Sequence, residues 1–265
     1  MKKINSKSHI FILCGGKGTR LDHEGKIKAK PMVKIGSKPL LMHLIESFYN
    51  QGFSRFVFCL GYKSDTIVDF FIKENKKKIN IIFKKKNHLK FLFNSKFLKF
   101  EGNLIFTGIN SGTGGRLLKS YKKLNLNEDI LMTYGDGLSN IKLKNLVNFH
   151  YKNNALVSLA AVRPKQRYGV LKIKKDRVNF FDNSNKKIDI YINGGYFVIS
   201  KDSIKKIKNE KIYWEQEPLN YFLNKKKLFA YKHDGFWKSL DTLKDKNDFN
   251  ELIKKKKLLW KVRKN

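Results

Sequence analysis

The sequence predicts an α/β fold in which a mostly parallel β-sheet is flanked by helices. In the first half of the chain, short apolar runs alternate with segments of helical periodicity, which is the pattern of right-handed βαβ units. A glycine-rich segment directly follows the first apolar run, and ligands of such sheets bind beyond the carboxyl ends of the strands. At 265 residues and 41% hydrophobic residues, the chain can form one large domain with a sizeable core.

The elements of the first half follow from local patterns. The apolar run at residues 9–13 predicts the first strand. Pro39 precedes a helix whose apolar residues recur at helical spacing, and Gly52 follows its end. Other apolar runs predict strands at 56–60, 79–83 and 129–134, and periodic segments predict helices at 65–73, 114–123 and 141–153. Residues 84–103 are basic, aromatic and irregular, and no element is assigned to them.

The second half of the chain is richer in predicted strands. Apolar and β-branched segments predict strands at 155–162, 168–173, 178–181 and 191–200. Two later segments, 215–223 and 242–256, have helical periodicity.

The formal net charge is +35, and 50 of the 57 basic residues are lysine. Such a charge fits a polyanionic partner. It fits equally well a lysine-rich surface on an ordinary enzyme, because the lysine runs are scattered and nucleic-acid readers depend more on arginine. We expect no dedicated nucleic-acid site, while a positive field would help to attract anionic substrates.

Nothing in the sequence resembles a membrane span or a secretory leader, so we expect a cytoplasmic protein with no membrane partner. Cys14 and Cys59 are far apart, and each ends an apolar run. They are expected to be free, buried thiols.

The first candidate site is the segment Leu13-Cys14-Gly15-Gly16-Lys17-Gly18-Thr19-Arg20. Its glycines let the backbone turn tightly and present N–H groups to a phosphate or a base edge. Thr19 adds a hydroxyl, and Arg20 can bind phosphate oxygens with a forked guanidinium. The segment matches neither the Walker A pattern nor G-x-G-x-x-G, and an ordinary glycine turn is the alternative interpretation.

Charged residues outside this segment complete the candidate site. Lys30 lies about ten residues beyond Arg20 and can return to the same phosphates, although a solvated lysine is the alternative. Asp136 ends a predicted strand between two glycines, where a carboxylate suits Mg²⁺ and a turn residue is the alternative. Asp241 directly precedes the helix that begins at Thr242, and its interpretation from the residues alone is the N-cap of that helix.

Several further motifs extend along the chain. They are Lys30-Pro31-Met32-Val33, Thr113-Gly114-Gly115-Arg116-Leu117, Tyr134-Gly135-Asp136-Gly137, Arg167-Tyr168-Gly169, Ile192-Asn193-Gly194-Gly195-Tyr196, Trp214-Glu215-Gln216-Glu217-Pro218 and Gly235-Phe236-Trp237. With the glycine segment, they make residues 9–260 resemble the sugar-phosphate nucleotidyltransferases. The Thr-Gly-Gly-Arg and Trp-Glu-Gln-Glu-Pro motifs resemble more narrowly the glucose-1-phosphate cytidylyltransferase branch.

The resemblance implies a Rossmann-like sheet of the nucleotide-diphospho-sugar transferase type with a strand-rich acceptor-binding portion. Residues 1–265 would form one domain, with a basic extension (1–8), a nucleotide-binding half (about 9–140) and an acceptor-binding half (about 141–265). The reaction would be CTP plus a sugar 1-phosphate giving CDP-sugar and pyrophosphate. The resemblance also implies that family members associate, so a homo-oligomer is expected, and that the product serves polysaccharide biosynthesis.

The resemblance also assigns roles to residues of this chain. The catalytic residues would be Arg20, Lys30 and Asp136, and the Mg²⁺ ligands Asp136 and Asp241. The nucleotide would contact Leu13, Cys14, Gly15, Gly16, Lys17, Gly18, Thr19, Arg20, Lys30, Ser111, Arg116 and Gly135. The acceptor would contact Tyr168, Gly169, Asn193, Gly194, Glu217 and Trp237. An acceptor phosphate oxygen would attack the α-phosphorus in line, and needs no general base because it is already anionic.

The chain departs from the family where the sugar phosphate is bound. Asp182-Asn183-Ser184 replaces the family's Glu-Lys-Pro, so Asn183 supplies no charge, and Lys186 and Lys187 are candidates to replace it. Lys34 also stands where the family usually has Glu. Two alternatives follow: a cytidylyltransferase for another phosphorylated acceptor, and a non-catalytic relative that binds a nucleotide or a polyanion. The joint retention of Arg20, Lys30, Asp136 and Asp241 argues against the second.

Overall fold

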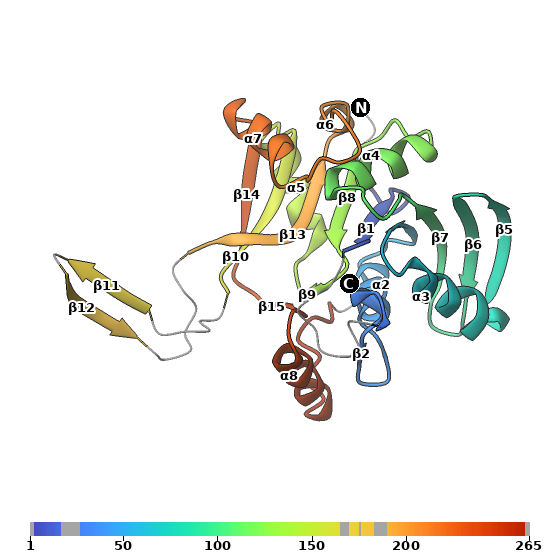
Figure 1. Cartoon of the computed structure of the whole chain (residues 1–265), viewed down its shortest axis with the longest axis horizontal. Coiled ribbons are helices and arrows are strands. Elements are labelled where there is room, and N and C mark those ends of the chain that lie inside the picture. The colour runs from blue at the N-terminus through green and yellow to red at the C-terminus, as the bar shows by residue number, and fades with distance from the viewer. Residues whose placement is uncertain (1–2, 17–26, 165–169, 175, 183–189, 263–265) are drawn as a thin grey trace.

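The computed structural model describes residues 3–16, 27–164, 170–174, 176–182 and 190–262. Its centre is one nine-stranded sheet that mixes parallel and antiparallel pairs (Figure 1). In sheet order the strands are β14 (Leu228–His233), β10 (Val157–Val162), β13 (Ile192–Ile199), β8 (Ile130–Tyr134), β1 (Ile10–Cys14), β4 (Arg55–Leu60), β7 (Lys99–Phe106), β6 (His88–Asn94) and β5 (Ile79–Lys85).

The middle of the sheet is parallel and its flanks are mostly antiparallel. Strand β1 pairs in parallel with β8 and β4, and β4 pairs in parallel with β7. On one side, β13 runs antiparallel to β8 and β10. On the other side, β5 and β6 extend β7 as an antiparallel meander. This arrangement confirms the predicted α/β fold, and strands from both halves of the chain share one sheet.

Helices cover both faces of the sheet. They are α2 (Leu40–Asn50), α3 (Ser64–Asp69), α4 (Thr113–Lys123), α5 (Leu143–Lys152), α6 (Lys201–Ile204), α7 (Glu217–Asn224) and α8 (Leu243–Lys254), with the short helices η1 (Lys30–Met32), η2 (Phe70–Glu74) and η3 (Lys76–Lys78). Among these α-helices, all except α6 overlap segments for which the sequence predicts a helix. None of these described helices is long and apolar enough to cross a bilayer.

Alternation along the strands produces two buried cores, one on each face of the sheet. Ile10 and Ile12 of β1 pack in the core that contains Leu40 and Leu44 of α2. Phe11, from the other face of the same strand, packs in the core that α4 and α7 cover. The helix that follows Pro39 is therefore fixed by the apolar face that the sequence predicted.

Three small ribbons complete the fold. Strand β2 (Lys34–Ile35) pairs with β3 (Lys38–Pro39), and β11 (Val170–Lys174) forms a hairpin with β12 (Arg177–Asp182) that stands apart from the sheet in Figure 1. The third ribbon pairs β9 (Gly137–Ser139) with β15 (Trp237–Ser239). This last ribbon lies at the carboxyl end of β8 and positions the candidate site.

Candidate active site

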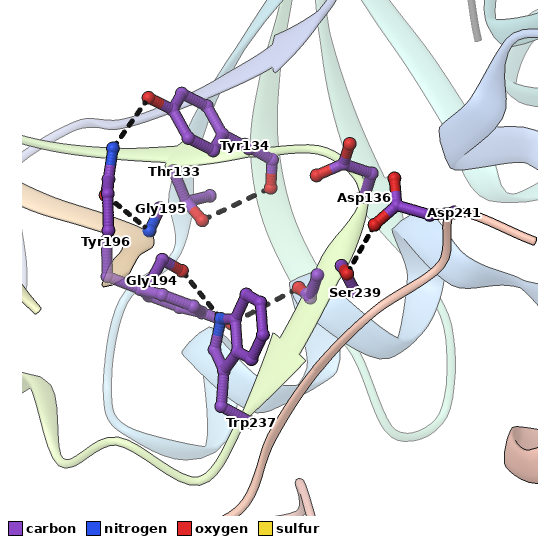
Figure 2. Close-up of a pocket in the computed structure, with 11 residues that line it drawn as sticks. Thr133, Tyr134, Asp136, Gly194, Gly195, Tyr196, Trp237, Ser239 and Asp241 are labelled. Carbon is purple, nitrogen blue, oxygen red and sulfur yellow. Dashed lines mark hydrogen bonds between the residues drawn. The ribbon is translucent and has the colours of Figure 1, made fainter. Parts of the chain in front are cut away.

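Three charged residues from distant parts of the chain meet beyond the carboxyl end of β8. Lys30 opens η1, Asp136 lies between β8 and β9, and Asp241 lies between β15 and α8. The Lys30 ammonium nitrogen is 2.8 Å from Asp136 Oδ2 and 2.6 Å from Asp241 Oδ1. Figure 2 shows the two aspartates side by side at the rim of a pocket. The structure thus brings together one predicted catalytic lysine and both predicted metal carboxylates.

The β9–β15 ribbon fixes the relative position of the two aspartates. Gly137 lies opposite Ser239 in the ribbon, and the Leu240 N–H donates to the Asp136 carbonyl at 2.7 Å. The Ser239 hydroxyl donates to Asp241 Oδ2 at 2.5 Å. Since Asp136 directly precedes β9 and Asp241 lies two residues beyond the end of β15, backbone hydrogen bonds of the ribbon set the spacing between the two carboxylates.

Asp241 does not cap the following helix. The N-cap of α8 is Thr242, whose side chain accepts from the Asp245 N–H while the Asp245 carboxylate accepts from the Thr242 N–H. This reciprocal pair is a complete capping box. The alternative interpretation of Asp241 as the N-cap is therefore wrong, and its carboxylate is left to Lys30, Ser239 and the pocket.

The charges of this cluster stabilise one another. Burial acts to lower the pKa of Lys30, but the charge and hydrogen bond of Asp136, together with those of Asp241, outweigh it and raise that pKa. Burial acts to raise the pKa of Asp241, and hydrogen bonds from Lys30 and Ser239 outweigh it, so that pKa is lowered. Lys30 is therefore an ammonium ion and Asp241 a carboxylate at neutral pH.

The two carboxylates fit a divalent cation of the Mg²⁺ type. Their side chains are 35% and 28% exposed, so both reach the pocket, and the ammonium that they share shows that the pair is arranged around a positive charge. Mg²⁺ binds hard oxygen ligands, and commonly takes one or two carboxylates with water and substrate phosphates in the other positions.

A cavity of about 200 Å³ adjoins the aspartates (Figure 2). Its walls come from the end of β8, the start of β13 and the β9–β15 ribbon. The Trp237 indole N–H donates to the Gly194 carbonyl at 2.7 Å, which holds the ring as one wall. Asn193 donates to the Tyr134 hydroxyl at 3.2 Å and accepts from the Gly195 N–H at 2.8 Å. Three predicted acceptor residues, Asn193, Gly194 and Trp237, therefore line one cavity.

Behind this cavity, Glu215 connects the cavity wall to α4. Its carboxylate accepts from the Tyr134 hydroxyl and, at 2.6 Å, from Thr113 Oγ1. Burial and the charge of Glu215 raise the pKa of Tyr134, so this hydroxyl remains a donor. The predicted acceptor residue Glu217 instead begins α7, pairs with Lys208 and does not line the cavity. Both glutamates belong to the Trp-Glu-Gln-Glu-Pro motif, and the motif alone does not show which carboxylate holds the cavity residue Tyr134.

Arg116, predicted to contact the nucleotide, lies buried beneath the glycine segment. Its guanidinium donates to Thr107 Oγ1 and to four carbonyls, those of Gly15, Leu60, Gly108 and Ile109, at 2.8–3.1 Å. A Cβ on Gly15 would lie 2.3 Å from the guanidinium carbon, so this position requires glycine. Arg116 therefore joins the carboxyl ends of β1, β4 and β7. The glycine segment leaves the first of these strands.

The other predicted nucleotide residues divide into two groups. Leu13 and Cys14 end β1, Gly16 follows them, Ser111 donates to the Thr107 carbonyl, and the Gly135 N–H donates to the Leu13 carbonyl at 3.1 Å. Lys17, Gly18, Thr19 and Arg20 lie outside the described residues, as do Tyr168, Gly169, Asn183, Lys186 and Lys187.

The two cysteines are free and buried, as predicted. Burial raises the pKa of the Cys59 thiol to about 12. The Cys14 thiol also has a pKa raised by burial, so neither cysteine is a ready nucleophile.

Comparisons with known proteins identify the family of this chain. Residues 10–255 match the family model described as Nucleotidyl transferase. The chain is 36% identical over 251 residues to the glucose-1-phosphate cytidylyltransferase of Salmonella typhimurium, covering 95% of this chain and 98% of that protein. It is 30% identical to a probable glucose-1-phosphate cytidylyltransferase of Bacillus subtilis, again covering 95% and 98%.

Solved structures show the same fold. The crystal structure of HddC from Yersinia pseudotuberculosis matches with a TM-score of 0.66 and 26% identity, covering 93% of this chain and 99% of that one. A second structure of HddC, complexed with GMP-PN, matches with a TM-score of 0.65 and 25% identity over the same shares. With a family model that spans most of its length and relatives that align nearly end to end, this chain belongs to the nucleotidyl transferase family.

Proposed function

We propose that this enzyme transfers CMP from CTP to a sugar 1-phosphate, with glucose 1-phosphate as the first acceptor to test, and that it requires Mg²⁺. The proposal rests on one observation above all, the cluster in which Lys30 bridges Asp136 and Asp241 beside a cavity of about 200 Å³. The Salmonella relative, which aligns over 98% of its length, supports cytidine as the base and glucose 1-phosphate as the acceptor.

Asp136 and Asp241 are the residues that would hold Mg²⁺. When bound, the ion would offset negative charge on the phosphoryl oxygens of the nucleotide. Lys30 is 15% exposed and supplies a second positive charge at the same place. A fixed ammonium in a partly dry site stabilises developing charge more strongly than one in water.

In the proposed reaction, a phosphate oxygen of the acceptor attacks the α-phosphorus of CTP. The new O–P bond forms in line with the bond to pyrophosphate, which breaks and takes its electron pair. The attacking oxygen is anionic, so the protein contributes positioning and charge rather than a general base. Asn193 and Trp237, fixed by their own hydrogen bonds, would orient the sugar, and Lys30 would donate to the phosphoryl oxygens.

The decisive experiment measures pyrophosphate release with Mg²⁺ for each of CTP, UTP, GTP, ATP and dTTP against a panel of acceptor phosphates. Release with CTP and glucose 1-phosphate supports the full proposal. Asp136→Asn should abolish that release, whereas Asp65→Asn, which changes an exposed carboxylate on α3, should not.

A second candidate is guanylyl transfer, which the HddC complex with GMP-PN favours. Release with GTP and not CTP would replace the base and keep the mechanism. Release with CTP from another acceptor alone would replace the sugar. If no combination releases pyrophosphate and CTP still binds, a non-catalytic nucleotide binder would be favoured over the proposal.

A further inference from the structure

A second, larger cavity lies far from the aspartates. It has a volume of about 490 Å³ and lies on the α4 face of the sheet. His9 and Arg55, which line it, stand at the amino ends of β1 and β4, whereas Lys30, Asp136 and Asp241 gather beyond the carboxyl end of β8. The two cavities are thus at opposite ends of the parallel strands.

The cavity exists because the sheet is wider than the helix that covers it. Strands β5 and β6 form the edge of the sheet farthest from β14 (Figure 1). Register across the sheet aligns Phe11 with Val57, Val57 with Asn103, and Asn103 with Lys90. The aligned residues beneath α4 are apolar, and those beyond the edge of the helix, Asn103 and Lys90, are polar.

A chain of polar side chains forms the floor of this cavity. His88 and Asn103 are 6% and 1% exposed, and the His88 Nε2 is 2.9 Å from Asn103 Oδ1. Asn103 donates to Glu101 at 3.4 Å, and Glu101 pairs with Lys90 at 3.1 Å. Buried polar groups cost stability unless they are hydrogen-bonded, and here the hydrogen bonds and the ion pair fix the positions of the floor side chains.

Positive charge dominates the walls. Arg55, Lys85, Lys90 and Lys123 line the cavity, with Glu101 as the one carboxylate among the described lining residues. The neighbouring Glu128 is paired with His9 at 2.8 Å. Burial lowers the pKa of His88, and the charges of Lys123, Lys90 and Lys85 lower it further, so three ammonium groups act on one point.

The cavity also has an apolar side. Leu124 and Leu126 line it just beyond the end of α4. The Phe83 ring meets the His88 ring edge to face, with centroids 4.7 Å apart. Ligand pockets typically combine a volume of about 300–1,000 Å³ with apolar walls and a few fixed polar groups, and this cavity has all three.

We propose that this cavity is a second binding site, for a phosphate-bearing small molecule. The phosphate groups lie among Lys85, Lys90 and Lys123, and the rest of the ligand packs against Phe83 and Leu124. Ammonium groups bind phosphate as point charges, and the His88 and Asn103 side chains of the floor can supply further hydrogen bonds. The site requires neither the proposed base nor the proposed sugar at the aspartates.

The histidines report on this site directly. Of the six histidines in the chain, His9 and His88 line the cavity, and their ring signals can be assigned by NMR with His9→Gln and His88→Gln. Inorganic pyrophosphate and CDP are each titrated into the full-length protein at constant ionic strength. We expect saturating shifts of both signals, and the same shifts in Asp136→Asn, where the other site is changed.

Charge-matched variants separate a site from diffuse attraction. Lys85→Ala/Lys123→Ala removes two exposed cavity lysines and should weaken binding about tenfold or more, since each contact is a charge-assisted hydrogen bond. Lys76→Ala/Lys77→Ala removes the same charge from η3, outside the cavity lining, and should change binding less than about twofold. Tighter binding of CDP than of pyrophosphate would show that the nucleoside contacts the apolar side, and equal binding that the phosphate suffices.

Three results would each overturn the proposal. One is that neither probe shifts the His9 and His88 signals. Another is a shift that rises with probe concentration without saturating. The third is equal weakening by the two lysine pairs, which would mean that the whole positive surface attracts the anion.

Discussion

Arg116 and Lys30 are both cations near the glycine segment, and their surroundings are opposite. Arg116 is 5% exposed and donates to neutral acceptors, namely four carbonyls and the Thr107 hydroxyl. Lys30 donates to two carboxylates that reach a cavity. The neutral acceptors around Arg116 hold its guanidinium inside the fold. Lys30 and its two carboxylates form a charged cluster beside the cavity, where a ligand can change their contacts.

The hydrogen bonds of Arg116 give it a structural role beside the nucleotide contact predicted for it. The five acceptors lie at or just beyond the carboxyl ends of β1, β4 and β7, so the guanidinium positions Gly15 at the start of the glycine segment. A lysine could not replace it, because an ammonium lacks the planar fork that reaches several carbonyls at once.

The largest effect should come from Arg116→Met, because it leaves buried carbonyls without donors. We expect the free energy of unfolding to fall by about 3–5 kcal/mol, as measured by urea denaturation. Arg55→Met is the matched control, because the Arg55 guanidinium donates to a single acceptor within the described part of the chain, the Lys7 carbonyl, and its loss should cost less than about 1 kcal/mol. Equal losses in the two variants would contradict the positioning role of Arg116.

Lys30→Met should act on catalysis rather than on the fold. We expect the rate of pyrophosphate release to fall by about 10²–10³, the usual effect of losing one preorganised charge. Lys34→Met, four residues away on an exposed position, should retain the rate. Because two carboxylates then face each other unpaired, added MgCl₂ should raise the Tm of Lys30→Met more than that of the unmodified protein. An equal rise in both proteins would argue against the aspartates as cation ligands.

An acid titration tests the neutral histidines that are buried on helices α2 and α5. Burial lowers the pKa values of His43 and His150 from 6.5 to about 4. Between these values the unfolded chain binds protons that the folded chain does not, so stability falls as the pH falls from 6.5 toward 4. We expect a loss of roughly 2–3 kcal/mol per histidine. Urea denaturation at several pH values should show that the free energy of unfolding of His150→Gln falls less steeply as the pH is lowered. An unchanged dependence on pH would refute the role given to His150.

The smallest effect separates the two glutamates of one motif. Glu215→Gln weakens the hydrogen bonds that hold Tyr134 and Thr113, and should raise KM for the sugar 1-phosphate by about tenfold with little change in kcat. Glu217→Gln affects an exposed ion pair with Lys208 and should leave both constants unchanged. A larger effect at Glu217 would restore the interpretation made from the sequence.

The sequence predicts those parts of the fold in which local pattern and tertiary environment agree. Helix α2 and strands β1, β4 and β8 are apolar where they are buried, so their periodicity was sufficient. The sequence does not predict strands β6 and β7, because charged and polar residues interrupt the apolar alternation that marks a strand. The ribbon strands β9 and β15 have three residues each, too few for any period.

The candidate site shows the same limit. Lys30, Asp136 and Asp241 could be chosen from the sequence because their motifs occur in the family's order. The orientation of side chains within a motif could not be chosen, as Glu215 and Glu217 show, because it depends on how α7 packs against the sheet. The predicted nucleotide contact of Arg116 stays a prediction, and the enclosure of its guanidinium by carbonyls depends on three strand ends that only the fold brings together.

The β9–β15 ribbon has a consequence for how such an enzyme can diversify. Both aspartates are attached to the same pair of hydrogen-bonded strands, although the chain between them includes a hairpin and several helices. Insertions or deletions in that intervening stretch would leave the spacing of the carboxylates unchanged. The spacing of the two carboxylates is thus insulated from changes in the loops of that stretch, so the cavity wall can change in evolution without moving them.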